Sequence, residues 1–116
     1  MIASLRGTVA EKGDSFVILE VNGVGYKVFV IKSVIESTTL GEEFYCLTHQ
    51  HVREDVLDLY GFSKMEELEL FGMLLSISGV GPRSAQSVLD VASIDDLKAA
   101  ISADDPALLK QVAGIG

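Results

Sequence analysis

The chain has 116 residues, of which 48% are hydrophobic and 22% are charged, a balance that excludes an intrinsically disordered protein. The longest stretch without a charged residue, residues 70–82, is too short to cross a membrane. The net charge of −8 is shared evenly, with −4 on residues 1–62 and −4 on residues 63–116. Neither half is therefore a basic nucleic-acid-binding domain by composition, and any contact with DNA must depend on local geometry and local charge.

The N-terminus and the cysteine content bear on the cellular compartment. No apolar run precedes Glu11, so the sequence does not begin like a secretory signal. Cys46 is the single cysteine, which excludes an intrachain disulfide and is typical of a reducing environment. We therefore expect a cytoplasmic protein with no membrane segment.

Residues 1–62 are predicted to form strands, because their apolar residues come in short runs rich in Val, Ile, Phe and Tyr. The run at residues 2–10 is expected to be the first strand. Two further runs flank Asn22-Gly23, and this dipeptide is the strongest short signal for a hairpin with a type I′ turn.

A second hairpin is predicted from the runs at residues 43–52 and 56–60, with Arg53-Glu54-Asp55 at its tip. Residues 33–39 are expected to form a short helix between the two hairpins. Five strands with one short helical connection favour a closed barrel of the OB type. Several strand runs are apolar on both faces, which suits a barrel with a second covered surface.

Residues 63–116 are predicted to form an all-α domain, because the apolar spacing changes to that of helices. Ser63 with Glu66 is a capping box that opens a helix extending to Ser78. Pro82 is expected to occupy the first position of the next helix, the position that proline favours. The apolar stripe of that helix is Ala85, Val88 and Leu89.

Two more helix starts are predicted near the end of the chain. Ser93 with Asp96 is a second capping pair, and Asp105-Pro106 is expected to open a last helix. Together with the barrel, these helices predict an α+β chain with a barrel domain at 1–62 and a helical domain at 63–116.

The helical half contains a repeat. The pattern apolar-x-x-apolar-x-Gly-apolar-Gly occurs at residues 74–81 and again 35 residues later, at 109–116. Glycines permit a tight turn whose backbone N–H groups point outward, and the next helix offers its N-terminus, so each copy is a ready anion site. For two paired copies the natural anion is a nucleic-acid backbone, and such contacts read phosphate and not sequence.

The predicted phosphate-contacting residues follow from this pattern. The first copy and the helix start after it contribute Gly79, Val80, Gly81, Pro82, Arg83 and Ser84, and the second copy contributes Gly114, Ile115 and Gly116. The alternative for a single Gly-x-Gly is an ordinary turn, and the alternative for Arg83 is a solvated side chain. The second copy at a matching place favours the binding interpretation.

Other polar residues have plainer explanations. Glu54 and Asp55, taken alone, are a solvated hairpin turn. His49 and His51 share one strand face, but no third ligand at a sensible spacing is visible, so no metal site is predicted. Cys46 is expected to be a small core residue. No catalytic set, phosphate-binding loop or cofactor motif is present, and we predict no catalytic residues and no cofactor.

The sequence resembles one family along its whole length. Four segments carry the resemblance: Val52-Arg53-Glu54-Asp55, Leu59-Tyr60-Gly61-Phe62, residues 74–83 with Gly79-Val80-Gly81-Pro82-Arg83, and Gly114-Ile115-Gly116. These segments, in this order, are similar to the RuvA family of Holliday-junction-binding proteins. Residues 22–26 and the opening residues also fit the start of that family.

The resemblance implies an OB-type barrel followed by two helix-hairpin-helix motifs. It also implies a homotetramer that holds a four-way DNA junction open, with octamers as an open alternative, in DNA recombination and repair. The tips that resemble Glu54-Asp55 would form an acidic pin near the four-fold axis, where they repel phosphates. The family itself is not catalytic, and a partner AAA+ motor, RuvB, hydrolyses ATP during branch migration.

One departure from the family concerns the C-terminus. Family members continue past the second Gly-x-Gly into a basic helix, a linker and a third domain that engages RuvB, whereas this sequence stops at Gly116. We therefore expect a truncated chain with an incomplete second phosphate site and no domain for the motor.

Three other classes remain as alternatives at this point. A generic OB module for single strands would need aromatic residues and a basic groove, while aromatic residues make up 7% of the chain. A helix-hairpin-helix glycosylase or nuclease would need a base or a metal cluster. A protein-interaction scaffold is compatible with the acidic composition.

Overall fold

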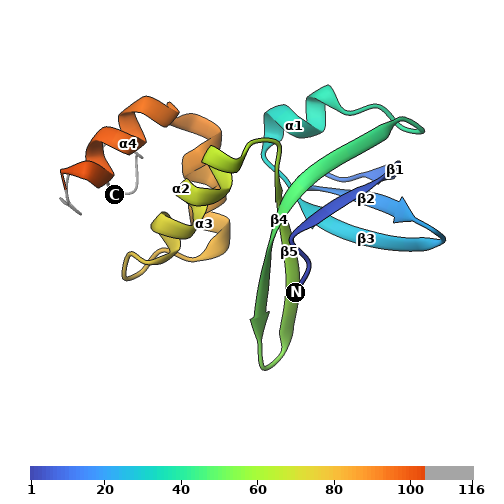
Figure 1. Cartoon of the computed structure of the whole chain (residues 1–116), viewed down its shortest axis with the longest axis horizontal. Coiled ribbons are helices and arrows are strands. Elements are labelled where there is room, and N and C mark those ends of the chain that lie inside the picture. Colours follow the sequence, from blue (N-terminus) through green and yellow to red (C-terminus); the bar gives the residue numbers. More distant parts are fainter. Residues whose placement is uncertain (104–116) are drawn as a thin grey trace. The chain divides into compact units, whose positions relative to one another are not determined.

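The computed structural model describes residues 1–103 (Figure 1). The chain divides into two compact units, Met1–Leu68 and Glu69–Gly116, which are treated separately below. The first unit contains strands β1 (Ser4–Lys12), β2 (Phe16–Val21), β3 (Val24–Phe29), β4 (Glu43–Arg53) and β5 (Val56–Phe62), with helix α1 (Lys32–Ser37) between β3 and β4. None of the described helices is long and apolar enough to span a membrane.

The five strands form a closed barrel in the order β1-β2-β3-β5-β4, which confirms the predicted five-stranded barrel. Four of the strand pairs are antiparallel, and β3 with β5 is parallel. Successive side chains of a strand point to opposite faces. The inner face is lined by fully buried side chains, among them Val17, Leu19, Val28 and Cys46.

The first hairpin turn follows the sequence prediction. Asn22 has a φ of 50° and Gly23 a φ of 86°, the two positive values that a type I′ turn requires. The register Val21↔Val24 leaves these two residues alone in the loop. Asparagine and glycine tolerate this conformation better than other residues, so the local sequence is sufficient to place the turn.

The first strand has the predicted length of nine residues but lies two residues later, from Ser4 to Lys12 and not from residue 2 to residue 10. β1 continues through Glu11 and Lys12, which pair with Ile18 and Val17, whereas the predicted strand ended at Ala10. The register shifts between Val9 and Glu11, so Ala10 has no partner in β2, and the pairing resumes with Glu11 opposite Ile18.

Aromatic side chains cover part of the outer face of the barrel. Phe29 stacks on Tyr60 with ring centroids 5.3 Å apart, and Phe16 meets Phe29 edge-on at 6.3 Å. Phe29 and Tyr60 are buried. The predicted second covered surface is therefore partly formed within the chain itself.

The helical part comprises α2 (Met65–Leu75), α3 (Pro82–Val91) and α4 (Ile94–Ser102). Ala85, Val88 and Leu89 are buried, as predicted for the stripe of α3. Ser93 Oγ accepts a hydrogen bond from the Asp96 N–H at 3.1 Å, which confirms the predicted cap of α4. The helix predicted from Asp105-Pro106 lies outside the described residues.

Two expectations for α2 were wrong in detail. The helix ends at Leu75 and not at Ser78, because a tighter turn, with Ile77 N–H donating to the Leu74 carbonyl, replaces its continuation. The capping acid is Glu67 and not Glu66. Its Oε1 accepts hydrogen bonds from the Lys64 N–H at 3.2 Å and from Ser63 Oγ at 3.1 Å. Because the helix begins at Met65, Glu67 occupies the third helical position that a capping box uses.

Candidate nucleic-acid interface

The connection between α2 and α3 is a tight turn built on Gly79. Its φ is +86°, a left-handed conformation that side-chain-bearing residues rarely adopt. The Val80 N–H donates to the Ile77 carbonyl at 3.1 Å, which closes the turn. Val80 is 8% exposed, so its side chain anchors the turn in the interior.

Gly81 and Pro82 open α3. Gly81 is the N-cap, and it makes no side-chain capping bond because it has no side chain. Its carbonyl accepts the first bond of the helix from the Ala85 N–H at 2.9 Å. An α-helix has no internal acceptors for the N–H groups of its first turn, and its dipole is positive there, so this end favours an anion. Arg83 and Ser84 are exposed on the same first turn.

Gly79 and Gly81 differ in backbone conformation, although the space beside both is open. A Cβ built on either Gly79 or Gly81 would meet nothing within 4 Å, so the surface beside both is open to an approaching ligand. Gly79 has a positive φ, whereas Gly81 has a φ of −92° and a ψ of 175°, an extended conformation that any residue adopts. A side chain at Gly79 would strain the backbone, whereas one at Gly81 would only occupy the open space.

The second predicted copy of the pattern, with Gly114, Ile115 and Gly116, lies outside the described residues. Of the two candidate phosphate sites, the structure therefore describes the first alone, Gly79 to Ser84.

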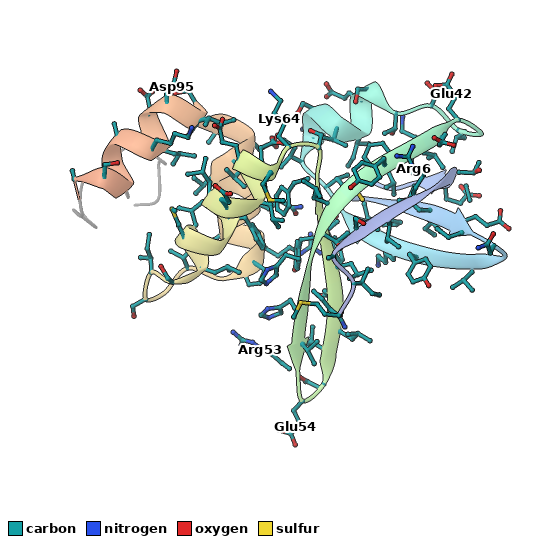
Figure 2. All side chains as sticks on the ribbon, viewed as in Figure 1. Arg6, Glu42, Arg53, Glu54, Lys64 and Asp95 are labelled. Carbon is teal, nitrogen blue, oxygen red and sulfur yellow. The ribbon has the colours of Figure 1, made fainter. Side chains whose placement is uncertain are left out.

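The acidic tip lies in the other unit, at the end of the β4–β5 hairpin. Arg53 pairs with Val56 in the ladder, so Glu54 and Asp55 form a two-residue turn, and both are exposed. Glu54 points away from the end of the hairpin, and Arg53 extends to one side of it (Figure 2). The tip therefore presents two carboxylates to solvent, and no surrounding barrel residue covers them.

A further acidic residue, Asp58, shares a strand face with the histidines. The ladder pairs His51 with Asp58 and His49 with Tyr60, so Asp58 lies directly across from His51. The sequence analysis did not connect these residues, although counting outward from the two-residue tip gives this pairing. Burial lowers the pKa of His49 below its usual value, and the nearby charge of His51 lowers it further.

Neither the histidines nor Cys46 forms a metal site or a reactive thiol site among the described residues. Among residues 1–103, no group of three or more His, Cys, Asp or Glu side chains is placed to hold a metal ion. Cys46 is buried, and burial raises the pKa of its thiol to about 11. A thiol with that pKa stays protonated at neutral pH and is a poor nucleophile.

Comparison with known proteins identifies the family. Residues 1–61 match the model of the RuvA N-terminal domain, more than half of the chain. The chain belongs to the RuvA family. Residues 71–116 match the model of a SAM-like helix-hairpin-helix tandem, which covers the hairpin at Gly79. The order of the two matches agrees with the barrel and the helices described above.

Three relatives carry the description Holliday junction branch migration complex subunit RuvA. The protein from Acetivibrio thermocellus is 44% identical over 100% of this chain and 58% of its own length. The protein from Halothermothrix orenii is 47% identical over 96% of this chain and 57% of its own length. The protein from Rickettsia bellii is 38% identical over 100% of this chain and 57% of its own length. The chain thus spans somewhat more than half the length of these family members.

Proposed function

We propose that this chain is the junction-binding part of a non-catalytic RuvA subunit, which binds four-way DNA as a tetramer and holds it open for branch migration. The observation that carries the proposal is the hairpin at Gly79. It combines a left-handed glycine, an open surface and the start of α3 in a chain of the RuvA family.

The hairpin supports phosphate binding through its backbone. N–H groups at a helix start attract an anion without any basic side chain. This explains how a chain of net charge −8 contacts DNA. The residues proposed to contact phosphate are Gly79, Gly81, Pro82, Arg83 and Ser84, with Gly114, Ile115 and Gly116 as the proposed second site. Val80, which the sequence also suggested as a contact, anchors the turn instead, because its side chain is buried and its N–H is bonded to the Ile77 carbonyl.

The exposed carboxylates of Glu54 and Asp55 support the role of an acidic pin. In a four-fold assembly, two carboxylates from each chain would gather near the axis, where four DNA arms converge. Carboxylates repel phosphates, so they discourage a continuous duplex from crossing the centre. Attraction at the hairpins and repulsion at the centre would together guide the strands into four arms.

Exposed apolar residues support a tetramer formed through the barrel. Val52 and Leu57, a cross-strand pair near the tip, are 63% and 69% exposed. An open cavity of about 430 Å³ on the same unit is lined partly by the apolar side chains of Met1, Tyr45 and Leu47. A second copy of the chain is the occupant that a cyclic assembly would supply.

The partners follow from the same proposal. The chain would bind a four-way DNA junction and other copies of itself. The RuvB motor would bind through a further domain of the full-length subunit, and that motor would supply ATP hydrolysis. We propose a cytoplasmic location on the same grounds.

The test compares a labelled four-way junction with a linear duplex of equal length, by fluorescence anisotropy at two salt concentrations. We expect the chain to bind the junction more tightly than the duplex. Gly79→Val should weaken binding to the junction. Gly72→Ala is the matched control, because Gly72 is exposed on α2 and its added Cβ would meet nothing within 4 Å.

Equal affinity for the junction and the duplex would contradict the proposal and favour a generic nucleic-acid module. Absence of DNA binding would favour a protein-interaction scaffold. A Gly79→Val protein that is folded by circular dichroism and binds like the Gly72→Ala control would remove the hairpin from the interface.

A further inference from the structure

The β4–β5 hairpin has two chemically different faces near its tip. We call residues 49–58 the arm, and Figure 2 shows this end of the hairpin, with Arg53 and Glu54 labelled. One face carries Val52 and Leu57, whereas the other carries His49, His51 and Arg53 from β4 with Asp58 from β5. We call this second face the imidazole face.

The imidazole face holds every histidine of the chain. The sequence contains two histidines, and both are half-buried on this face. Ordinary carboxylates titrate near pH 4 and lysines above pH 10. The thiol of Cys46, with its pKa raised to about 11, is also silent near neutrality. Histidine is the side chain type whose charge ordinarily changes near neutral pH, and this face carries both histidines of the chain.

Their protonation changes the charge of the arm substantially. With neutral imidazoles the arm carries one positive charge, on Arg53, and three negative charges, on Glu54, Asp55 and Asp58, for a net −2. Two protonated imidazoles bring this net charge to zero. The carboxylates of the tip would then belong to an arm with no net charge.

The distances make this change relevant to the tip. His51 is three residues from Glu54, which corresponds to about 10 Å along an extended strand. The Debye length at 0.1 M salt is also about 10 Å, so the charge of His51 is only partly screened at the tip. His49 is farther from the tip and should contribute less.

We propose that His49 and His51 make the arm a proton-dependent part of the DNA interface, in which protonation strengthens DNA binding and reduces the preference for a junction over a duplex. This inference rests on the proposed function, because it requires phosphates near the acidic tip. Each protonated imidazole also gains a second N–H donor, which a phosphate oxygen can accept.

Other charged groups near this face bear on the size of the effect. Asp58 attracts a protonated His51 across the strands and compensates part of its charge. Arg6 and Glu43, farther along the outer face, are paired with each other at 2.9 Å. His49 shares the wall of the open cavity with Met1, Met65 and Leu68, and the α-amino group of Met1 is the ionisable group among these three residues. The first turn of α2 adds Glu66 and Glu67, and Glu67 bonds to Ser63 and Lys64.

The experiment measures junction and duplex affinity of the whole chain at pH 8.0, 6.5 and 5.5, with ionic strength held constant. We expect junction affinity to rise by about 1.5- to 5-fold for each imidazolium that engages DNA, as for an exposed ion pair. Duplex affinity should rise more, and the dependence of affinity on salt should steepen at low pH. His49→Gln with His51→Gln should abolish the change.

Two further variants separate the arm from general charge. His51→Lys carries one permanent charge, so it should show at pH 8.0 part of the stronger binding that the unmodified chain reaches at pH 5.5. Glu36→Gln raises the net charge by one on the exposed surface of α1 and should keep the full pH dependence. Proton uptake on binding, measured by calorimetry in two buffers at pH 6, tests the unmodified chain without any variant.

The outcomes distinguish this inference from the proposed function. Preferential junction binding with no pH dependence and no proton uptake would overturn the inference and leave the function standing. The same would follow if the double histidine variant kept the pH dependence. Absence of junction preference at every pH would overturn the proposed function and this inference with it.

Discussion

The two turns of the proposed interface handle phosphate in opposite ways. The α2–α3 turn at Gly79 offers backbone N–H groups and an open surface, whereas the β4–β5 turn at Glu54-Asp55 offers two exposed carboxylates. The α2–α3 turn is expected to attract an anion through its backbone, and the β4–β5 turn is expected to repel it through two carboxylates. In the proposed interface, the backbone of one turn supplies the attraction for DNA, and the side-chain charge of the other turn keeps DNA away.

The largest expected effect is at the attracting turn. Gly79→Val should weaken junction binding by roughly tenfold or more, because the added side chain blocks the approach of a phosphate and strain of about 1–3 kcal/mol favours displacement of the turn from its binding geometry. Gly81→Val should weaken binding less, since its φ of −92° suits any residue. Anisotropy titrations of both variants against Gly72→Ala check this order. An equal loss of junction affinity in the two variants would show that backbone strain at Gly79 does not contribute.

The next effect concerns the assembly that would bring the repelling turns together. Val52→Thr with Leu57→Thr should shift the chain toward monomers, because each apolar side chain buried in an interface contributes about 1.5–3 kcal/mol. Light scattering across a dilution series measures the shift. A chain without these substitutions that is monomeric at micromolar concentration would refute the tetramer directly.

Neutralising the repelling turn should have a smaller effect of opposite sign. Glu54→Gln with Asp55→Asn should tighten DNA binding several-fold and lower the preference for junctions, since a pair of unit charges a few ångströms apart repels by about 1–4 kcal/mol before salt screening. Parallel titrations of junction and duplex at two salt concentrations test this. An unchanged ratio at low salt would make both residues ordinary turn residues.

Arg83 offers a milder test of the attracting turn. Arg83→Ala should reduce the slope of log affinity against log salt by about one, which is the loss of one phosphate contact. Affinity should fall alike for every DNA sequence, because phosphate contacts carry no sequence information. A slope identical to that of the unmodified chain would place Arg83 outside the interface.

The smallest effect is on stability. The pKa of His49 is lowered in the folded chain, mainly by burial, so the unfolded state binds more protons as the pH falls below the usual histidine value. Stability from this group is therefore present above that value and lost below it. The melting temperature should fall between pH 7.5 and 5, and His49→Gln should reduce the fall. An identical fall in the variant would assign it to other groups.

Much of the barrel could be predicted from local sequence. Asn22-Gly23 placed the first turn because both residues tolerate positive φ. The second tip was predicted at Arg53-Glu54-Asp55, and it is one residue shorter because Arg53 pairs with Val56 in the ladder. Pro82 began α3 and Ser93 capped α4, since both signals act within one helical turn. The glycine pattern at residues 74–81 also located the hairpin, because a turn with a left-handed glycine followed by a buried apolar residue requires this spacing in the sequence.

The remaining features depended on contacts between segments far apart in the sequence. The parallel pairing of β3 with β5, the extension of β1 past Ala10 and the burial of Tyr60 against Phe29 are set when the barrel closes. The choice of Glu67 over Glu66 followed from where α2 begins. Neighbouring residues determine which turns and helix starts are favourable. Tertiary packing alone decides where strands end and which faces are buried, because both depend on segments that are far apart in the sequence and meet only in the folded chain.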